Sequence, residues 1–340
     1  MHPREVLLGS KTSAGFLPVC DHYSGVEARM RKSLQLQAEM IEEFGACVFD
    51  VTLDCEDGAP AGGEADHAAM VIAMVKLADA RARVAVRVHA VDHPAFEADI
   101  SAIAGQAGHR LSHLMLPKVE SIADVDRAVA ALAAVSAAHL PLHVLIESSA
   151  AVHEVFSIAA HPRVQSLSFG LMDFVSSHAG AVPADAMSSR GQFTHPLVVR
   201  AKLEISAACH AFGKVPSHGV VTEFSDSEAV HLAARKAASD FGYCRMWSIH
   251  PMQIRPILQA FAPSDSDVED AAKIIAAAAR ADWAPISFGG KLHDRASYRF
   301  FWQVLERAHQ TGRAIPSEAL GFFTPVALQT TDPVSLALNA

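Results

Sequence analysis

The chain has 340 residues, of which 51% are hydrophobic, a composition typical of a compact enzyme-sized domain rather than of a disordered protein. Its formal net charge of −9 and its scattered basic residues argue against a nucleic-acid partner. No apolar run approaches the ~20 residues of a membrane span, the N-terminus has no signal-peptide pattern, and the cysteines form no C-x-x-C motif, so we expect a soluble cytoplasmic protein with reduced thiols.

Short apolar segments alternate with Ala-rich helical patterns along most of the chain. The predicted strands are Gly15–Cys20, Cys47–Asp54, Arg83–Val88, His113–Pro117, Leu142–Glu147, Ser166–Gly170, Val215–Val221 and Cys244–Ile249. The predicted helices are Ala28–Phe44, Glu64–Ala80, Phe96–Gly105, Ile122–His139, His153–Ala160, Pro196–Phe212 and Asp226–Gly242. The pattern predicts an α/β fold, a (β/α)8 TIM barrel whose active site lies at the carboxyl ends of the strands. A doubly wound open sheet is the alternative, less favoured because no G-x-G-x-x-G follows the first strand.

The repeating pattern ends near Phe261. We therefore expect a barrel domain over residues 1–262 and a C-terminal helical extension over 263–340, which acts as a cap or oligomerisation arm. The extension should contain helices at Val268–Ala281 and Ala296–Thr311 with a turn at Gly289-Gly290 between them. Within the barrel, residues 175–194 form a long Ser-, Gly- and Pro-rich segment, which we interpret as a lid loop over the site.

Two neighbouring strands of this pattern each lead into a single carboxylate, Glu147 and Asp173. Since the carboxyl ends of parallel strands meet at one edge of a sheet, we expect these two side chains to lie close together. Two hard oxygen ligands suit Mg²⁺, or Mn²⁺, better than Zn²⁺. The alternative for either acid alone is that it caps the following helix.

Other strand ends also carry charge. The second ends in Asp54-Cys55-Glu56-Asp57, and the third contains Arg87 in an apolar strand. Arg87 is a candidate for bidentate recognition of a substrate carboxylate or thioester oxygen, and the alternative is a structural ion pair with Glu56 or Asp57. Asp54 could accept hydrogen bonds from loop amides, and Glu56 could orient a metal-bound water or pair with Arg87.

Lys118 and Glu120 follow the fourth strand, and we interpret them as a structural pair at the barrel rim. His250 follows the eighth strand and is expected to be a rim histidine satisfied by backbone groups.

The strand ends together resemble the HpcH/HpaI aldolase and citrate lyase β-subunit family, and in particular its malyl-CoA and citramalyl-CoA lyase-like branch. The motifs that carry the resemblance are Leu53-Asp54-Cys55-Glu56-Asp57-Gly58, Arg87-Val88, Leu116-Pro117-Lys118-Val119-Glu120-Ser121, Ile146-Glu147-Ser148, Phe169-Gly170-Leu171-Met172-Asp173 and Ile249-His250-Pro251. They occur in the family's order over roughly residues 16–300.

The resemblance implies a TIM barrel that assembles into a trimer or hexamer and holds Mg²⁺ on Glu147 and Asp173. It implies that Arg87 contacts substrate, and we expect Gly170, Leu171 and Met172 to lie at the substrate as well. The family's C-terminal segment often covers a neighbouring subunit's site and carries an acid. Asp294 in Gly290-Lys291-Leu292-His293-Asp294 is its candidate here, and the alternative is that Asp294 caps the next helix.

The chain departs from the family after the first strand. A P-G-x-R-P-like loop commonly helps to hold CoA there, whereas this chain has Asp21-His22-Tyr23-Ser24-Gly25 without the Arg.

The leading hypothesis is a Mg²⁺-dependent carbon–carbon lyase that cleaves a β-hydroxyacyl-CoA into a 2-ketoacid and an acyl-CoA enolate. Arg87 would stabilise the enolate oxygen, and Asp294 or Glu56 would act as acid or base. The alternatives are a CoA-independent ketoacid aldolase at the same metal site, a CoA-thioester hydrolase and a non-catalytic metabolite-binding barrel.

Overall fold

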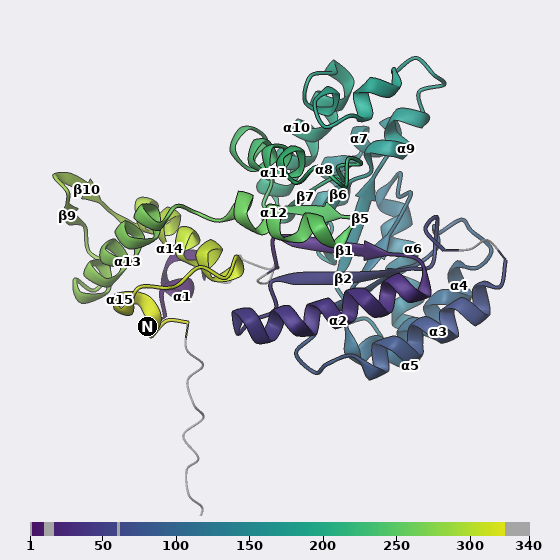
Figure 1. Cartoon of the computed structure of the whole chain (residues 1–340), viewed down its shortest axis with the longest axis horizontal. Helices are drawn as coiled ribbons and strands as arrows, with labels where there is room; N and C mark the ends of the chain where they lie inside the picture. The colour runs from purple at the N-terminus through teal and green to yellow at the C-terminus, as the bar shows by residue number, and fades with distance from the viewer. Residues whose placement is uncertain (1, 10–16, 60–61, 324–340) are drawn as a thin grey trace, which may run out of the picture.

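A computed structural model of the chain describes residues 2–9, 17–59 and 62–323. Eight parallel strands close into a barrel in the order β1-β2-β3-β4-β5-β6-β7-β8, with helices around it and further helices after it (Figure 1). Every neighbouring pair is parallel, including β8 with β1, so no edge is left open. This arrangement confirms the predicted TIM barrel.

The strands of the barrel are β1 Cys20–Ser24, β2 Phe49–Asp54, β3 Val84–Arg87, β4 Leu111–Leu116, β5 Leu142–Ile146, β6 Val164–Phe169, β7 Val215–His218 and β8 Arg245–Ser248. The surrounding α-helices are α2 Glu27–Phe44, α3 Glu64–Leu77, α4 Phe96–Asp99, α5 Gly105–Ala107, α6 Ile122–Ala134, α7 Ser149–His153, α8 Val155–Ala160, α9 Leu171–Ser176, α10 Pro196–Ala211, α11 Ser227–Phe241 and α12 Pro251–Phe261. A π-helical turn, η2 Ile100–Ala104, and three 3-10 turns, η3 Gly108–Arg110, η4 Ala184–Met187 and η5 Gly191–Phe193, complete this part of the chain.

The first strand differs from its prediction. β1 runs from Cys20 to Ser24, so Asp21, His22 and Tyr23 are strand residues rather than a loop, and Gly15 and Phe16 lie outside the described residues. The prediction missed this strand because its side chains are polar. They can be buried because the barrel interior supplies them with partners. Asp21, for example, pairs with Arg245 of β8, a residue 224 positions later in the chain, and no local sequence pattern shows such a contact.

A charged layer lies near the amino ends of the strands, inside the barrel. Arg245 Nη2 is 2.8 Å from Asp21 Oδ2 and 2.6 Å from Asp50 Oδ2, and all three side chains are fully or almost fully buried. Arg83 donates from Nε to Asp50 Oδ1 at 2.6 Å. Because an unpaired buried charge would be strongly destabilising, these opposite charges must lie together.

An apolar layer lies above the charged one. Since side chains in a strand alternate between two faces, Tyr23, Met115, Leu145 and Trp247 lie on the same inner face as the residues two positions before them. Met115, Leu145 and Trp247 form a buried cluster that packs against Tyr23 and Val220. Two residues further along their strands, on the same inner face, Asp54, Arg87 and Glu147 lie at the carboxyl ends. The apolar layer therefore separates the charged interior from the strand ends.

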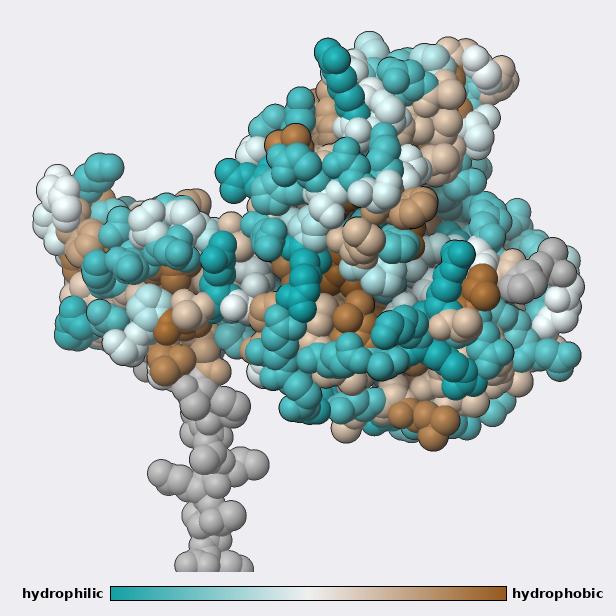
Figure 2. All heavy atoms as spheres, viewed as in Figure 1, coloured by the Kyte–Doolittle hydropathy of each residue, from teal (hydrophilic) through white to brown (hydrophobic). Residues whose placement is uncertain are grey.

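The helices after the barrel have a core of their own. α13 Asp265–Arg280, the hairpin β9 Ile286–Phe288 and β10 Lys291–His293, α14 Arg295–Gln310 and α15 Ser317–Leu320 form this unit, and α1 Pro3–Leu8 at the N-terminus packs on it. Trp302, Tyr298 and Leu7 belong to its buried cluster. In Figures 1 and 2 the unit is a lobe beside the barrel, and hydrophilic residues cover most of the visible face. The division into domains at residue 262 stays a prediction.

This C-terminal lobe meets the amino-terminal end of the barrel. Arg307 of α14 donates to the carbonyl oxygen of Cys244, just before β8. Gly312 lies against Phe44 at the end of α2, where a Cβ on the glycine would come within 2.2 Å of the phenyl ring. The lobe therefore lies at the end of its own barrel opposite to the strand carboxyl ends.

Two further observations bear on the sequence predictions. No helix among the described residues is long and apolar enough to cross a membrane. The glycine turn was placed correctly, because Gly289 and Gly290 adopt φ angles of 58° and 74° and join β9 to β10 in an antiparallel hairpin. Such positive φ angles suit glycine in a two-residue hairpin turn. The helix α12 after β8 was not predicted.

Buried histidines should make the fold sensitive to acid. Burial lowers the pKa of His143 to about 3 and that of His22 to about 4. An unfolded histidine binds a proton below pH ~6.5, whereas these folded ones do not, so the free energy of unfolding should fall with pH below that value. Each such histidine contributes a slope of about 1.4 kcal/mol per pH unit.

The slope, measured by urea unfolding between pH 7 and pH 5, should be reduced in His143→Gln by the contribution of one histidine. His153→Gln is the matched control, because the His153 side chain is 83% exposed, and it should keep the wild-type slope. An unchanged slope in His143→Gln would show that His143 titrates normally in the folded protein.

Candidate active site

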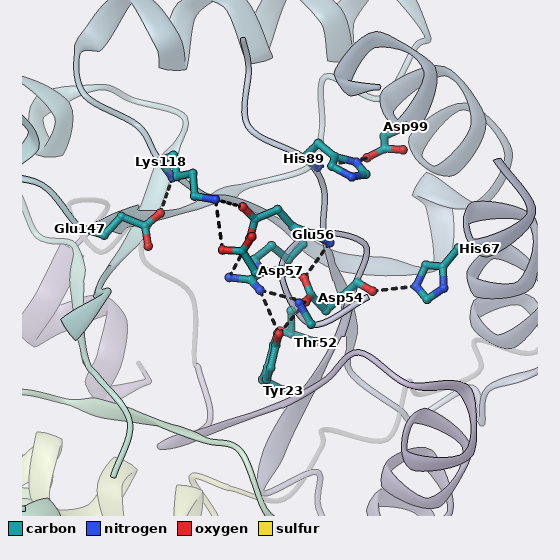
Figure 3. Close-up of polar contacts among 12 residues, drawn as sticks. Tyr23, Thr52, Asp54, Glu56, Asp57, His67, His89, Asp99, Lys118 and Glu147 are labelled. Atoms are coloured by element: carbon teal, nitrogen blue, oxygen red, sulfur yellow. Dashed lines mark hydrogen bonds and ion pairs between the residues drawn. The ribbon is translucent and has the colours of Figure 1, made fainter. Parts of the chain in front are cut away.

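The carboxyl ends of β2, β3, β4 and β5 bring the predicted charged residues together. Figure 3 shows Glu147 and Lys118 on one side, Tyr23 and Asp54 on the other, and Glu56 and Asp57 between them. Asp54 is the last residue of β2, and Glu147 follows β5 directly. The structure therefore brings these charged residues of the strand ends into one cluster, and their role in catalysis stays a prediction.

Arg87, the last residue of β3, is held by two carboxylates. Its Nε and Nη2 donate to Asp54 Oδ1 and Oδ2 at 2.6 and 2.8 Å, and its Nη1 lies 3.2 Å from Glu56 Oε2. An ion pair with Glu56 was one form of the structural alternative, whereas the bidentate pairing with Asp54 was not predicted. Since the fork of the guanidinium is used by Asp54, Arg87 does not present that fork to a substrate carboxylate.

Asp54 accepts more hydrogen bonds than those from Arg87. The backbone N–H groups of Glu56 and Gly58 donate to it at 3.1 and 2.6 Å, which confirms the predicted contact with loop amides. The Tyr23 hydroxyl donates to Oδ2 at 2.5 Å. Burial alone would raise the pKa of Asp54, but the hydrogen bonds and charge of Arg87 lower it below its usual value. Asp54 is therefore a fixed anion that organises its neighbours.

Lys118 connects the Arg87 group to Glu147. Its Nζ forms ion pairs with Glu56 and Asp57, and its backbone N–H donates to Glu147 Oε1. The residue has a φ of 52°, in the left-handed region that non-glycine residues rarely adopt. The predicted pairing with Glu120 is wrong. Lys118 turns instead toward the acidic segment after β2, and the backbone N–H of Glu120 binds Asp124.

Glu147 and Asp173 form the second charged group. Glu147 is 6% exposed, and its pKa is raised to about 7 by burial and by the negative charge of Asp173. Its carboxylate lies where a side chain on Gly170 would be, because a Cβ there would come within 2.5 Å of Glu147 Oε2. Asp173 lies in the first turn of α9, a short helix that was not predicted, and not at the end of β6 itself.

A pair of neighbouring carboxylates at the barrel mouth fits a hard divalent cation. Bringing two negative charges together while burying one of them is unfavourable unless a cation compensates them. Their oxygen atoms are the ligands that Mg²⁺ prefers, and Mg²⁺ usually keeps waters and substrate oxygens as its remaining ligands. The donor set therefore fits the predicted ion, and the assignment of Glu147 and Asp173 as its ligands stays a prediction.

Among the described residues, one other group could hold a metal ion. Asp21, His113 and His143, all buried in the charged layer, each offer one ligand atom within 4.8 Å of the others. Its chemistry differs, since two of its three donors are nitrogen atoms, which Mg²⁺ disfavours. Arg245 Nη2 already contacts the Asp21 carboxylate at 2.8 Å, and the two imidazole rings are stacked with centroids 3.5 Å apart.

The structure does not bring Asp294 to this cluster. Asp294 is exposed and caps α14, accepting hydrogen bonds from the N–H groups of Ala296 and Ser297 at 2.9 and 3.3 Å. The alternative reading as a helix cap is therefore correct for the isolated chain. The β9–β10 hairpin before it lies on the side of the C-terminal lobe away from the barrel (Figure 1).

A groove beside the cluster was not predicted. It has a volume of about 590 Å³ and is lined by residues of β1, α2, the loop after β7 and the start of α12. Its lining includes Tyr23, Arg29, Lys32, Phe224 and His250. The signal in the sequence was the spacing of Arg29 and Lys32, which places both cations on one face of the helix after the first strand.

Comparison with known proteins agrees with this architecture. Residues 34–251 match the model of the HpcH/HpaI aldolase/citrate lyase family. The chain is 33% identical to the L-malyl-CoA/beta-methylmalyl-CoA lyase of Cereibacter sphaeroides over 281 residues, which are 76% of this chain and 87% of that protein. The chain belongs to the HpcH/HpaI aldolase/citrate lyase family. It is a carbon–carbon lyase of the citrate lyase β and malyl-CoA lyase-like kind.

Solved structures also share its fold. A citrate lyase from Burkholderia xenovorans is 48% identical, with a TM-score of 0.77 over 95% of this chain and 99% of that one. CitE from Mycobacterium tuberculosis, solved with magnesium, acetoacetate and coenzyme A, is 23% identical, with a TM-score of 0.62 over 86% of this chain and 98% of that one. The second of these structures therefore holds magnesium together with acetoacetate and coenzyme A.

The two candidate metal groups make opposite predictions. If Glu147 and Asp173 hold the ion, Glu147→Gln should weaken Mn²⁺ binding by more than about tenfold, since even loss of an outer-shell partner costs that much. His143→Gln should leave the Mn²⁺ affinity unchanged. Titration followed by the electron paramagnetic resonance signal of free Mn²⁺ measures both. The reverse pattern would place the ion in the charged layer.

Proposed function

We propose that the chain cleaves a β-hydroxyacyl-CoA of the malyl-, citramalyl- or citryl-CoA type into a 2-ketoacid and an acyl-CoA. The observation that carries the proposal is the groove with Arg29 and Lys32, which adjoins the charged cluster at the strand ends through Tyr23. The lyase of Cereibacter sphaeroides acts on CoA thioesters of this type by its name, and its similarity supports the same substrate class here.

The groove has the chemistry that a CoA moiety needs. Arg29 and Lys32 are exposed cations on α2, suited to the phosphates of CoA. Phe224 and His250 are stacked with ring centroids 5.1 Å apart and offer a flat surface to a purine ring. These cations can replace the Arg that the family's loop commonly provides. They favour a CoA thioester over the CoA-free substrate of an aldolase.

The ketoacid end of the substrate would lie at Glu147 and Asp173. Mg²⁺ held there supplies Lewis-acid polarisation of the substrate hydroxyl and carboxylate oxygens. Gly170 leaves room for the Glu147 carboxylate, and Leu171 and Met172 follow it at the start of α9, where the Met172 side chain is 41% exposed. Contacts between this segment and the substrate are part of the proposal.

The bond cleavage needs a base and a stabilised enolate. The base takes the proton of the β-hydroxyl, the electron pair of the carbon–carbon bond goes to the acyl fragment, and that carbon is then protonated. The Nη1 side of Arg87 would donate to the thioester oxygen as the enolate forms, a contribution worth about 3 kcal/mol in comparable sites. Glu56, held between Arg87 and Lys118, is the candidate base within the chain.

The proposal is tested by incubating the Mg²⁺-loaded protein with malyl-CoA, citramalyl-CoA and citryl-CoA and identifying the products. A ketoacid with the matching acyl-CoA is the expected result. Release of free CoA with an intact hydroxyacid would instead show a thioesterase. Cleavage of only a CoA-free hydroxy-ketoacid would show an aldolase.

Variants of the groove test the placement of CoA. Arg29→Gln and Lys32→Gln should each raise the KM for the CoA thioester by about three- to fivefold, the scale of an exposed ion pair, and leave kcat unchanged. Arg31→Gln is the matched control on the same helix, because Arg31 pairs with Glu27 and does not line the groove. An equal rise of KM in all three variants would show that the helix attracts the CoA thioester only by its overall charge and that the groove does not bind CoA.

Asp294 is proposed to act at the site of a neighbouring subunit in a homo-oligomer, a trimer or hexamer by resemblance. Leu292 and Phe300, on either side of it, are 77% and 61% exposed, which fits an interface between copies. If this is correct, Asp294→Ala and Glu147→Gln should each be inactive alone, and mixed oligomers should recover activity because some sites combine two intact halves.

The mixed oligomers are prepared by co-expression with two different tags, and size-exclusion chromatography with light scattering checks their assembly. If the mixed oligomers assemble but recover no activity, Asp294 does not act at a neighbouring site and serves only as the helix cap that the structure shows.

A further inference from the structure

Tyr23 lies at the point where the groove and the charged cluster meet. Its ring stacks on Trp247 of β8 with centroids 5.6 Å apart and an interplanar angle of 15°. The same ring faces Arg87, whose Cζ lies 4.8 Å from the ring centroid. The residue falls in the segment where this chain departs from the family's pattern, so its function is not given by the resemblance.

The Tyr23 hydroxyl closes a three-membered set of hydrogen bonds. It donates to Asp54 Oδ2 at 2.5 Å and accepts from Arg87 Nη2 at 2.9 Å, while Nη2 also donates to Asp54 Oδ2 at 2.8 Å. The phenol has one hydroxyl hydrogen, which it donates to the carboxylate, so its oxygen can only accept a hydrogen bond from Arg87. The direction of both hydrogen bonds is therefore determined by chemistry.

This set leaves Arg87 little freedom. A guanidinium has five N–H groups, one on Nε and two on each Nη. The Nε group binds Asp54, both Nη2 groups are taken by Asp54 and Tyr23, and Nη1 pairs with Glu56. The contact of Nη1 with Glu56 Oε2 is an ion pair without a hydrogen bond, so Nη1 remains able to donate to a substrate oxygen. Without Tyr23, one N–H on Nη2 would be released as a further donor, and Asp54 alone would hold that side of the guanidinium.

Two glycines make room for the phenol. A Cβ on Gly58, in the loop after β2, would lie 1.9 Å from the Tyr23 hydroxyl and 2.5 Å from Asp54 Oδ2. A Cβ on Gly25 would lie 2.0 Å from the carbonyl oxygen of Gly58. The loop after β1 and the loop after β2 therefore approach each other directly above Tyr23, at a distance that only glycine allows.

We propose that Tyr23 is a positioning residue for Arg87. By occupying one Nη2 hydrogen and bonding to Asp54, it leaves Nη1 as the one nitrogen of the guanidinium that can donate to the substrate. A single donor suits one developing oxyanion, such as that of a thioester enolate, and not a bidentate carboxylate. The inference rests on the proposed function through the role of Arg87 and goes beyond it by assigning a residue outside the family's pattern.

Tyr23→Phe tests this inference, because it removes only the hydroxyl and keeps the ring stacked on Trp247. Loss of a hydrogen bond to a charged group should lower kcat by about tenfold or more, while KM for the CoA thioester changes by less than about threefold. Tyr243→Phe is the matched control, since its hydroxyl donates to the Lys202 carbonyl oxygen at 3.0 Å, and it should retain both constants.

Gly58→Ala should give the same kcat loss as Tyr23→Phe, because its methyl group displaces the phenol. If this variant does not fold, Tyr23→Phe alone decides. An unchanged kcat in Tyr23→Phe would overturn the inference and leave the residue a packing partner of Trp247. A raised KM with unchanged kcat would also overturn it, because the hydroxyl would then bind substrate directly.

Crystal structures separate this inference from the proposed function. If the wild type cleaves no CoA thioester, the proposed function fails, but the orientation of Arg87 in wild type and Tyr23→Phe can still be compared. A guanidinium that turns away from Asp54 and Glu56 in the variant supports the positioning role. An unmoved guanidinium contradicts it whether or not the wild type is active.

Discussion

The ion pair between Arg87 and Asp54 is the interaction on which the site depends. Both charges are buried at the ends of adjacent strands, and each would be strongly destabilising without the other. Once they are paired, the remaining contacts follow. Glu56 approaches the free side of the guanidinium, Lys118 neutralises Glu56, and the backbone of Lys118 reaches Glu147. One chain of contacts thus connects four strand ends.

The same principle governs the interior of the barrel. Arg245 compensates Asp21 and Asp50 in the charged layer, and the apolar layer around Trp247 separates these charges from the mouth. Because the separation is apolar and tightly packed, the electrostatics of the two regions can differ. In the charged layer two cations, Arg83 and Arg245, balance Asp21 and Asp50. The mouth instead brings Glu147 near Asp173 and leaves a negative region suited to a cation.

The order of strands and helices could be predicted from the sequence because parallel strands covered by helices are apolar on both faces and leave a clear periodic pattern. The ends of the strands could be located for the same reason, and the charged residues Arg87, Glu56 and Glu147 were identified there. Tyr23 could not be found, since it is recognised only by its contacts with Asp54, Arg87 and Trp247, which lie 31, 64 and 224 positions later.

Other features also depend on distant contacts. The group of Asp21, His113 and His143 joins three strands, and its members lie too far apart in sequence to form a motif. Asp294 could be identified as an acid at a helix start, but the chain alone shows only its capping role. Both the C-terminal lobe and α1 depend on one cluster that contains Leu7 and Trp302, a pairing of the two ends of the chain that no local pattern indicates.

The most direct measurement of the central claim is calorimetric titration of the protein with glyoxylate, pyruvate and oxaloacetate, with and without Mg²⁺, followed by acetyl-CoA. The account predicts that a ketoacid binds only when Mg²⁺ is present, that acetyl-CoA also binds, and that Glu147→Gln loses the ketoacid while keeping acetyl-CoA. Ketoacid binding of equal affinity without Mg²⁺, or in Glu147→Gln, would contradict the assignment of this cluster as the metal-dependent catalytic site.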